Sequence, residues 1–357
     1  MSNPTRPISQ GEELPLENLK KFLISEGLLK SDKSALDISQ FSNGYSNLTY
    51  LIQAEQNAFV LRRPPFAAPK RGHDMGREYK VLSKLSAVFE KAPKTYAFCE
   101  DISIIGAPFY VMEKVEGEIL TAKEAFKRKV SPAEFRTIAN TWLDSFVEFH
   151  SIDYQKAGLE DLGKPIGYVE RQVTNWGKQY VAAATEEVPS AMKVMKWMEA
   201  QQPVSYDHTL IHNDFKYDNV VFKDATWKKI AAILDWEMCT LGDPLMDLGT
   251  SLGYWTTEHD AAFMKQGLPS PTVMPGNPSR EEVVHQYALK SGRTVDHIVF
   301  YYAYGLFKIA VIAQQIYYRY KHGHTQDPKF ANLNKAAALC CETAWQAIQK
   351  NKIDNLF

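Results

Sequence analysis

The sequence predicts an α+β protein of two lobes, in which a β-rich lobe precedes a larger, mainly helical lobe. Short apolar runs with the texture of strands dominate residues 36–63, whereas most segments beyond Gly117 have helical spacing. At 357 residues the chain is also long for a single hydrophobic core, so two lobes are expected on length alone. We place the lobes at residues 1–114 and 115–357.

Each segment of the first lobe has its own signal. The stretch "PLENLKKFLISEGLL" has Leu16, Leu19, Phe22 and Leu23 at helical spacing, and Gly27 is expected to end that helix. The runs "LTYLIQA" and "AFVLRR" flank the turn-like "EQN", which predicts an antiparallel hairpin. A helical period returns in "GHDMGREYKVLSKLSAVF", and two further strands are expected near "TYAFCE" and "FYVMEKV".

The second lobe is predicted to be built from helices. In "PAEFRTIANTWLDSFVEFHSI" one helical face gathers five side chains: Ile138, Leu143, Phe146, Val147 and His150. The segment "SREEVVHQYALKSG" opens with Ser279 and Glu282 at the spacing of a capping box and closes at Gly292. The Pro- and Gly-rich "GLPSPTVMPGNPS" is expected to be a loop.

Composition excludes several classes of protein. A formal net charge of −1 and a pI of about 6.8 give no overall electrostatic reason to bind nucleic acid. The N-terminus lacks the apolar core of a signal peptide, and the apolar stretch 298–316 is interrupted by Lys308 and two glutamines, as in a buried helix. The four cysteines form no CxxC pair, which favours thiols in a reducing compartment. We therefore expect a cytoplasmic protein with no nucleic-acid or membrane partner, and its oligomeric state is not indicated.

Polar residues crowd the segment "LIHNDFKYDNVVF", between two strand-like runs. It contains His212, Asp214, Lys216 and Asn219, and Asp235 follows at the end of the apolar run "IAAILD". Buried charges need partners, so this loop is expected to pair, ligate or react. Carboxylate and amide oxygens delivered to strand ends are suitable ligands for Mg²⁺.

The pattern H-x-D-x-x-x-x-N followed by a strand-terminal Asp resembles the catalytic pattern of the protein-kinase-like fold. Together, "LIHNDFKYDNVVF" and "ILDWEMCTLGDPLMDLG" resemble the aminoglycoside phosphotransferase and choline kinase branch, over residues 38–341. The greatest likeness is to the phosphotransferase domain associated with acyl-CoA dehydrogenases in animals, which has standalone bacterial relatives. The resemblance implies a bilobal protein-kinase-like fold, ATP and Mg²⁺ as cofactors, and a small-molecule hydroxyl acceptor.

The resemblance also implies roles for the clustered residues, and these agree with what phosphoryl transfer needs. Asp214 would orient the acceptor hydroxyl and take its proton, and Lys216 would neutralise the migrating phosphoryl group. Asn219 and Asp235 would hold Mg²⁺. Three flanking residues are expected to be structural, because they brace the loop or cap a helix: His212, Asp243 and Asp247.

The nucleotide half of the site departs from the kinase pattern. The segment "FSNGYSNLTYLI" lacks G-x-G-x-x-G, and the phosphate-cradling turn would instead use Ser42, Asn43, Gly44, Ser46 and Asn47. An ordinary hairpin turn is the alternative.

Arg62 stands where kinases have a phosphate-gripping lysine. Strand alternation places it on the same face as Val60, which favours it over Arg63. Glu78 is its expected ion-pair partner, with a solvated helix charge as the alternative. Adenine would meet the backbone of residues 113–115, from Glu113 to Val115, with Met112 near the ring.

The acceptor is predicted from the aromatic segment "HIVFYYAYGLFKIAVIAQQIYYRYKHGH", which ends in Arg319, Lys321, His322 and His324. This composition suits an acyl or anionic group better than a polycation, although at least half of the aromatics are expected in the core. The acyl-CoA-dehydrogenase-associated subgroup implies a hydroxyacyl-CoA or related hydroxy acid. The alternatives are an aminoglycoside, a choline- or homoserine-type substrate, and a catalytically silent pseudokinase that only binds.

Overall fold

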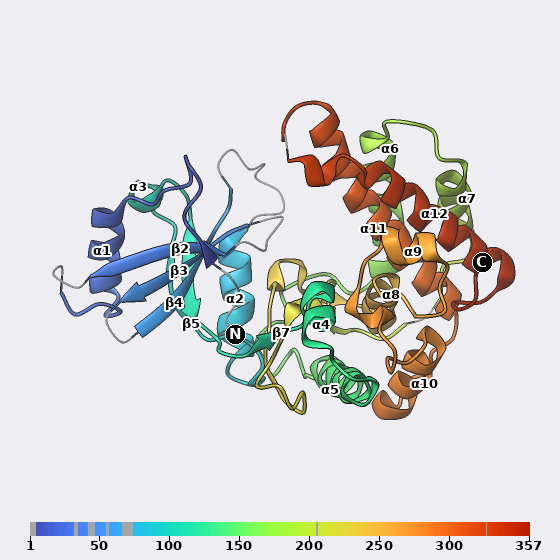
Figure 1. Cartoon of the computed structure of the whole chain (residues 1–357), viewed down its shortest axis with the longest axis horizontal. Helices are drawn as coiled ribbons and strands as arrows, with labels where there is room; N and C mark the ends of the chain where they lie inside the picture. The colour runs from blue at the N-terminus through green and yellow to red at the C-terminus, as the bar shows by residue number, and fades with distance from the viewer. Residues whose placement is uncertain are drawn as a thin grey trace.

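The protein has two parts, seen side by side in the computed structural model (Figure 1). The structure describes residues 5–31, 35–41, 47–54, 57–65, 74–204, 206–325 and 327–357. Strands of the first third lie at one end of the molecule, and the helices of the remaining chain lie at the other. This arrangement confirms the predicted bilobal α+β class.

The first part is built on a six-stranded sheet in the order β1-β2-β3-β4-β6-β5, in which all neighbouring pairs are antiparallel. Its strands are β1 (Thr5–Arg6), β2 (Leu36–Phe41), β3 (Leu48–Ala54), β4 (Asn57–Arg63), β5 (Thr95–Cys99) and β6 (Phe109–Glu113). Its helices are α1 (Leu16–Ser25), α2 (Met75–Leu85) and α3 (Ile102–Ile105). The predicted β3–β4 hairpin is present, although residues 55 and 56 at its tip lie outside the described part.

The two faces of this sheet are covered by different helices. Val60 packs in the core cluster that contains α2, whereas Leu61 packs in the cluster that contains α1 and part of α3. Because side chains alternate along a strand, Arg62 points to the α2 face and Arg63 to the α3 face. Arg63 is buried there and donates from its Nη1 to the carbonyl oxygen of Ile105 at 2.9 Å.

The second part combines two small sheets with most of the helices. The sheets are β10-β9-β7 and β11-β8, made of β7 (Glu118–Ile119), β8 (Thr209–Ile211), β9 (Val220–Phe222), β10 (Ile230–Ile233) and β11 (Thr240–Gly242). The first helices are α4 (Ala122–Arg128), α5 (Pro132–His150), α6 (Tyr168–Ala183) and α7 (Pro189–Ala200). The later helices are α8 (Pro244–Gly253), α9 (Ala262–Gly267), α10 (Arg280–Ser291), α11 (Ile298–Lys321) and α12 (Leu333–Lys350).

Local sequence signals locate several helix ends correctly. α1 ends at Ser25, and Gly27 has the left-handed φ of 72° that favours glycine just beyond a helix. Both reciprocal bonds of the Ser279–Glu282 capping box are present, and Gly292 caps the other end of α10. On α5 the predicted face is buried, apart from Val147, which is half-buried. The predicted loop before α10 includes a short 3₁₀ turn at Pro271–Val273.

The apolar stretch in α11 is the buried helix that its interruptions predict. Lys308 lies in the interior with 1% of its surface exposed, and α11 packs closely against α8 and α12 (Figure 1). In the described part of the chain, none of the helices is both long and apolar enough to span a bilayer.

Candidate active site

The polar segment 212–219 is the loop that joins β8 to β9. It brings Asp214, Lys216 and Asn219 together. Lys216 Nζ lies 3.0 Å from Asp214 Oδ2, and Asn219 Nδ2 donates to the same oxygen at 2.7 Å and to the Asp214 carbonyl at 2.9 Å. The Asp214 carboxylate is therefore held by a cation on one side and an amide on the other, and its direction is fixed by the two contacts.

Asp247, on α8, supports this loop from below. Its Oδ2 accepts the backbone N–H of His212 at 2.5 Å, and its Oδ1 accepts that of Asn213 at 2.7 Å. His150 Nε2 lies 3.2 Å from Oδ2. The side chain is wholly buried, and burial acts to raise the pKa of Asp247, but these donors hold that pKa below its ordinary value. Asp247 therefore braces the loop as an anion, as the sequence predicts.

His212 is a structural residue of the loop. It is fully buried, and its Nε2 lies 3.0 Å from the carbonyl oxygen of Leu234 at the end of β10. Burial lowers the pKa of His212, although Asp247 and Asp214 oppose that shift, so the ring is neutral at pH 7. The expected bracing by hydrogen bonding is thus present. Asp243 likewise caps α8, since its Oδ1 accepts the N–H of Leu245 at 2.8 Å.

Asp235 follows β10 and lies beside the loop 212–219. The backbone N–H of Leu234 donates to the carbonyl oxygen of Asn219 at 2.8 Å, which brings the two predicted metal ligands to adjacent strand ends. Asp235 has a left-handed backbone with φ of 67°, a conformation that is uncommon for non-glycine residues.

The donors at this edge suit a hard cation. Asn219 Nδ2 is engaged by Asp214, which leaves the amide oxygen as the atom that could bind a metal, next to the carboxylate of Asp235. Over the described ranges, His, Cys, Asp and Glu side chains form no group of three or more arranged to hold a metal unaided. One carboxylate beside one amide oxygen fits Mg²⁺, which takes few protein ligands and fills its shell with water and substrate phosphate.

Arg62 lies among three carboxylates. Its guanidinium nitrogens lie 3.0 Å from Glu78, 3.1 Å from Asp235 and 3.6 Å from Glu237. The expected ion pair with α2 is thus present, and Glu78 is 1% exposed, which excludes the alternative of a solvated helix charge. One guanidinium joins the sheet and α2 to Asp235, which lies 173 residues further along the chain.

Burial and pairing set the charges of this cluster. Burial raises the pKa of Glu78, and Arg62 works against that shift. Burial also acts to raise the pKa of Asp235, but the Arg62 guanidinium outweighs it and holds that pKa below its ordinary value. Burial acts to lower the pKa of Lys216, but the charge and hydrogen bond of Asp214, together with Tyr254 and Asp218, raise that pKa above its ordinary value. Asp235 and Lys216 are therefore charged at pH 7.

The predicted phosphate-cradling turn is described only at its end. Asn47 Nδ2 donates to Glu237 Oε2 at 2.7 Å, and this bond links the first sheet to the 3₁₀ turn after Asp235. Four residues of this prediction lie outside the described ranges: Ser42, Asn43, Gly44 and Ser46.

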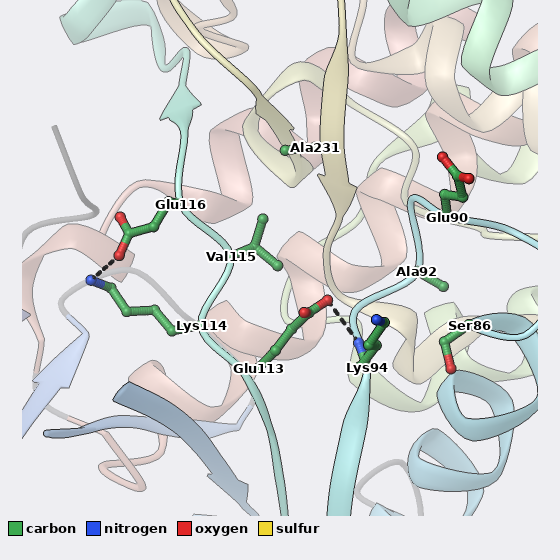
Figure 2. A pocket seen from close by; sticks show the side chains of 9 residues that line it. All are labelled: Ser86, Glu90, Ala92, Lys94, Glu113, Lys114, Val115, Glu116 and Ala231. Carbon is green, nitrogen blue, oxygen red and sulfur yellow. Dashed lines mark hydrogen bonds and ion pairs between the residues drawn. The ribbon is translucent and has the colours of Figure 1, made fainter. Parts of the chain in front are cut away.

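The segment after β6 borders a half-open hollow of about 570 Å³ (Figure 2). Glu113 and Val115 line it, and the Glu113 side chain accepts the backbone N–H of Lys94 at 2.9 Å. Met112 is buried in β6 and does not line this hollow. Because neither Arg62 nor Asp235 lines it, the hollow is separate from the charged cluster.

Several residues near the predicted site were not predicted from the sequence. Tyr254 places its ring 4.7 Å from Lys216 Nζ, and Glu237 contacts Arg62 and Asn47. Lys308 bonds to the residue before Asp214. Of these three residues, only Lys308 could have been identified from the sequence, because a lysine within an apolar helix needs a polar partner.

Comparisons with known proteins relate the chain to phosphotransferases. The model of the phosphotransferase enzyme family matches residues 37–271. The chain is 34% identical over 350 residues to acyl-CoA dehydrogenase family member 11 of Gallus gallus, covering 93% of this chain and 44% of the relative. The chain spans between 32% and 45% of the length of the curated relatives it matches.

Solved structures share the fold. A Ralstonia eutropha protein, provisionally described as an aminoglycoside phosphotransferase, superposes with a TM-score of 0.78 at 30% identity, covering 95% of this chain and 99% of that one. The aminoglycoside phosphotransferase APH(4)-Ia superposes with a TM-score of 0.60 at 14% identity, covering 92% and 98%. The chain belongs to the phosphotransferase enzyme family, whose members transfer a phosphoryl group to an acceptor hydroxyl.

Proposed function

We propose that this protein is an ATP-dependent small-molecule kinase that transfers the γ-phosphoryl group to the hydroxyl of a hydroxyacyl-CoA or related hydroxy acid. The proposal rests on the way the structure brings two carboxylates, those of Asp214 and Asp235, to neighbouring positions. Asp214 is held by Lys216 and Asn219, and Asp235 is held by Arg62 at the adjoining strand end. Residues 1–114 would bind the nucleotide, and residues 115–357 would supply the catalytic loop and the acceptor surface.

The reaction assigns a distinct task to each group. The acceptor oxygen attacks the γ-phosphorus, the bond from that phosphorus to the β–γ bridging oxygen breaks, and ADP leaves. The acceptor proton passes to the Asp214 carboxylate, whose Oδ2 lies 3.0 Å from Lys216 Nζ. Lys216 then lies close enough to neutralise the migrating phosphoryl group. Mg²⁺ on Asn219 and Asp235 would supply positive charge to the phosphate oxygens.

Nucleotide binding is assigned to the cluster around Arg62. The guanidinium can grip phosphate oxygens bidentately, and Glu78 fixes its direction. The backbone of residues 113–115 and Met112 would meet adenine, and the turn at residues 42–47 would cover the phosphates. The ternary complex of APH(4)-Ia contains AMP-PNP and hygromycin B, which supports a nucleoside triphosphate as the donor.

The acceptor assignment depends on the end of α11. Aromatic residues of its first half are core: Phe300, Tyr301, Tyr302, Tyr304 and Phe307. In its last turns the tyrosines are half-buried and the basic residues are exposed: Tyr317, Tyr318, Arg319, Tyr320 and Lys321. An exposed basic and aromatic surface suits an anionic acyl thioester better than a polycation. Relatives named as acyl-CoA dehydrogenase family members support an acyl-CoA acceptor.

The free buried thiols of all four cysteines agree with a cytoplasmic location.

The test is acceptor-dependent ADP release from Mg-ATP, comparing hydroxyacyl-CoAs with aminoglycosides and choline, with Asp214→Asn as the blank. We expect turnover on a hydroxyacyl-CoA that Asp214→Asn largely abolishes while nucleotide binding is kept. Turnover on aminoglycosides alone would replace the acceptor assignment. If Mg-ATP neither binds nor raises the melting temperature, the pseudokinase alternative replaces the kinase.

A second variant separates the two carboxylates. Asp235→Asn should weaken Mg-nucleotide binding, because it removes the anionic ligand while leaving the Asp214 base in place. The measurement is the dependence of ADP release on Mg²⁺ concentration. An unchanged metal dependence would contradict the role assigned to Asp235.

A further inference from the structure

Lys308 places a buried cation directly beneath the catalytic loop. It lies in the middle of α11 with 1% of its surface exposed. Its Nζ donates to the backbone carbonyl of Asn213 at 2.8 Å and to the Asn213 side-chain Oδ1 at 2.9 Å. The same Nζ lies 5.9 Å from the centre of the Trp176 ring, on α6. A single ammonium group therefore serves both oxygens of the residue that precedes Asp214.

Asn213 needs such support because its backbone is in the left-handed region, with φ of 69°. Left-handed non-glycine residues are strained and persist only where the surroundings fix them. The Asn213 N–H donates to Asp247, and its Nδ2 donates to the Met238 carbonyl at 3.1 Å. With Lys308 on both oxygens, every polar group of Asn213 has a partner, and each partner lies on a different segment.

The charge of Lys308 is retained at neutral pH despite its burial. Burial lowers the pKa of Lys308 to about 8. Asp247 of α8 and Asp214 of the loop favour the charged form, and Lys216 of the loop opposes it. An uncharged side chain of similar length would avoid this desolvation, but it would leave the Asn213 oxygens without a donor.

We propose that Lys308 is a positioning residue for phosphoryl transfer, which fixes the left-handed Asn213 and thereby aims the Asp214 carboxylate at the acceptor hydroxyl. The inference rests on the proposed kinase function for its catalytic part, while the holding of the loop can be measured without turnover. Lys308 does not touch the reacting atoms. Its effect should therefore appear in the rate of transfer more than in nucleotide affinity.

The experiment compares Lys308→Met, Lys308→Arg and the control Gln314→Met. Gln314 is also buried in α11, and its Nε2 donates to the Ala183 carbonyl at 2.9 Å, away from the loop. The two methionine variants thus each remove one buried donor to a carbonyl from the same helix. Two readouts are used: hydrogen exchange of residues 210–219 in the nucleotide-free protein, and kcat and KM for ATP in ADP release.

Lys308→Met should speed exchange in residues 210–219 and lower kcat on the order of 10- to 100-fold, as expected when a catalytic group is misplaced by about 1 Å. KM for ATP should stay within about threefold, because Arg62 and Asp235 are untouched. Lys308→Arg, which keeps a cation with several donors, should recover part of both losses. Gln314→Met should leave kcat and the exchange of residues 210–219 unchanged.

Equal losses of kcat in Lys308→Met and Gln314→Met would overturn the inference, since a general weakening of α11 would then explain both. Unchanged exchange in residues 210–219 of Lys308→Met would also overturn it. If the wild-type protein releases no ADP with any acceptor, the proposed function fails separately, and the exchange comparison still decides whether Lys308 holds the loop.

Discussion

Asp247→Asn is a stringent test of how the loop 212–219 is held. Both carboxylate oxygens of Asp247 accept backbone N–H groups, those of His212 and Asn213, and neither donor can reverse its role. An amide has one acceptor oxygen, so its NH₂ would face one of these N–H groups. With the NH₂ at the Oδ2 position, the His150 ring can change tautomer and accept from it, so one buried backbone donor lacks an acceptor, at about 1–3 kcal/mol. We expect the free energy of unfolding to fall by about 1–3 kcal/mol.

Asp243→Asn provides a matched control on the same helix. Asp243 is also buried and uses both oxygens, accepting from the Leu245 N–H and the Tyr301 hydroxyl. Asparagine caps helices as well as aspartate does, and the Tyr301 hydroxyl can rotate to accept from the new NH₂. Burial also raises the pKa of Asp243 to about 6, so the substitution removes a costly buried charge at pH 7. We expect no destabilisation beyond about 1 kcal/mol.

The assay is urea-induced unfolding at pH 7, followed by tryptophan fluorescence, with hydrogen exchange of residues 210–219 as the local readout. Asp247→Asn should shift the urea midpoint down and speed exchange in the loop, and Asp243→Asn should do neither. Equal midpoints for the two variants would refute the reasoning. Asp247 accepts from backbone N–H groups that cannot change role, whereas Asp243 accepts from the Tyr301 hydroxyl, which can rotate.

Two further outcomes are expected from the packing and charge of α11. Gly305→Ala should lower the melting temperature by an amount that reflects about 1–3 kcal/mol or more, because its Cβ would lie 2.0 Å from the Gly249 carbonyl oxygen on α8. Gly177→Ala, whose Cβ would meet only the end of the flexible Met195 side chain at 3.2 Å, should be neutral or stabilising; equal losses would contradict this account. The free energy of unfolding of the wild type, relative to that of Lys308→Met, should rise with pH between about 8 and 10.5, by up to about 3 kcal/mol. In this range the folded protein has lost the Lys308 proton, because the pKa there is about 8, whereas the unfolded chain keeps it up to the ordinary pKa of 10.5. Urea midpoints at several pH values measure this difference, and a flat difference would refute it.

The sequence predicts those features that depend on neighbouring residues. The β3–β4 hairpin, the Ser279–Glu282 capping box and the left-handed Gly27 all follow from short-range spacing. The face of β4 on which Arg62 lies can be predicted because side chains alternate along a strand and the apolar Val60, two residues earlier, is buried in the core. Motif spacing likewise identifies Asp214, Asn219 and Asp235, which the structure brings to adjacent strand ends.

Partners from distant segments could not be predicted. Lys308 and Asn213 are 95 residues apart, and Arg62 and Asp235 are 173 residues apart. A lysine in an apolar helix signals that a partner exists, but its identity depends on how α11 docks. That docking requires the backbones of α8 and α11 to approach closely at Gly249 and Gly305. The spacing of residues within one helix does not reveal such an approach.

The polar groups crowded around residues 212–219 also stabilise unusual backbone conformations, besides placing Asp214. Asn213 and Asp235 both have left-handed backbones, and neither conformation is stable in an isolated peptide. Asp247 of α8 and Lys308 of α11 offset the cost at Asn213, and the Arg62 ion pair holds Asp235. The reactive geometry therefore exists only when several helices have already packed. None of these contacts involves the exposed end of α11, so the acceptor surface proposed there could change without disturbing the alignment of the carboxylates.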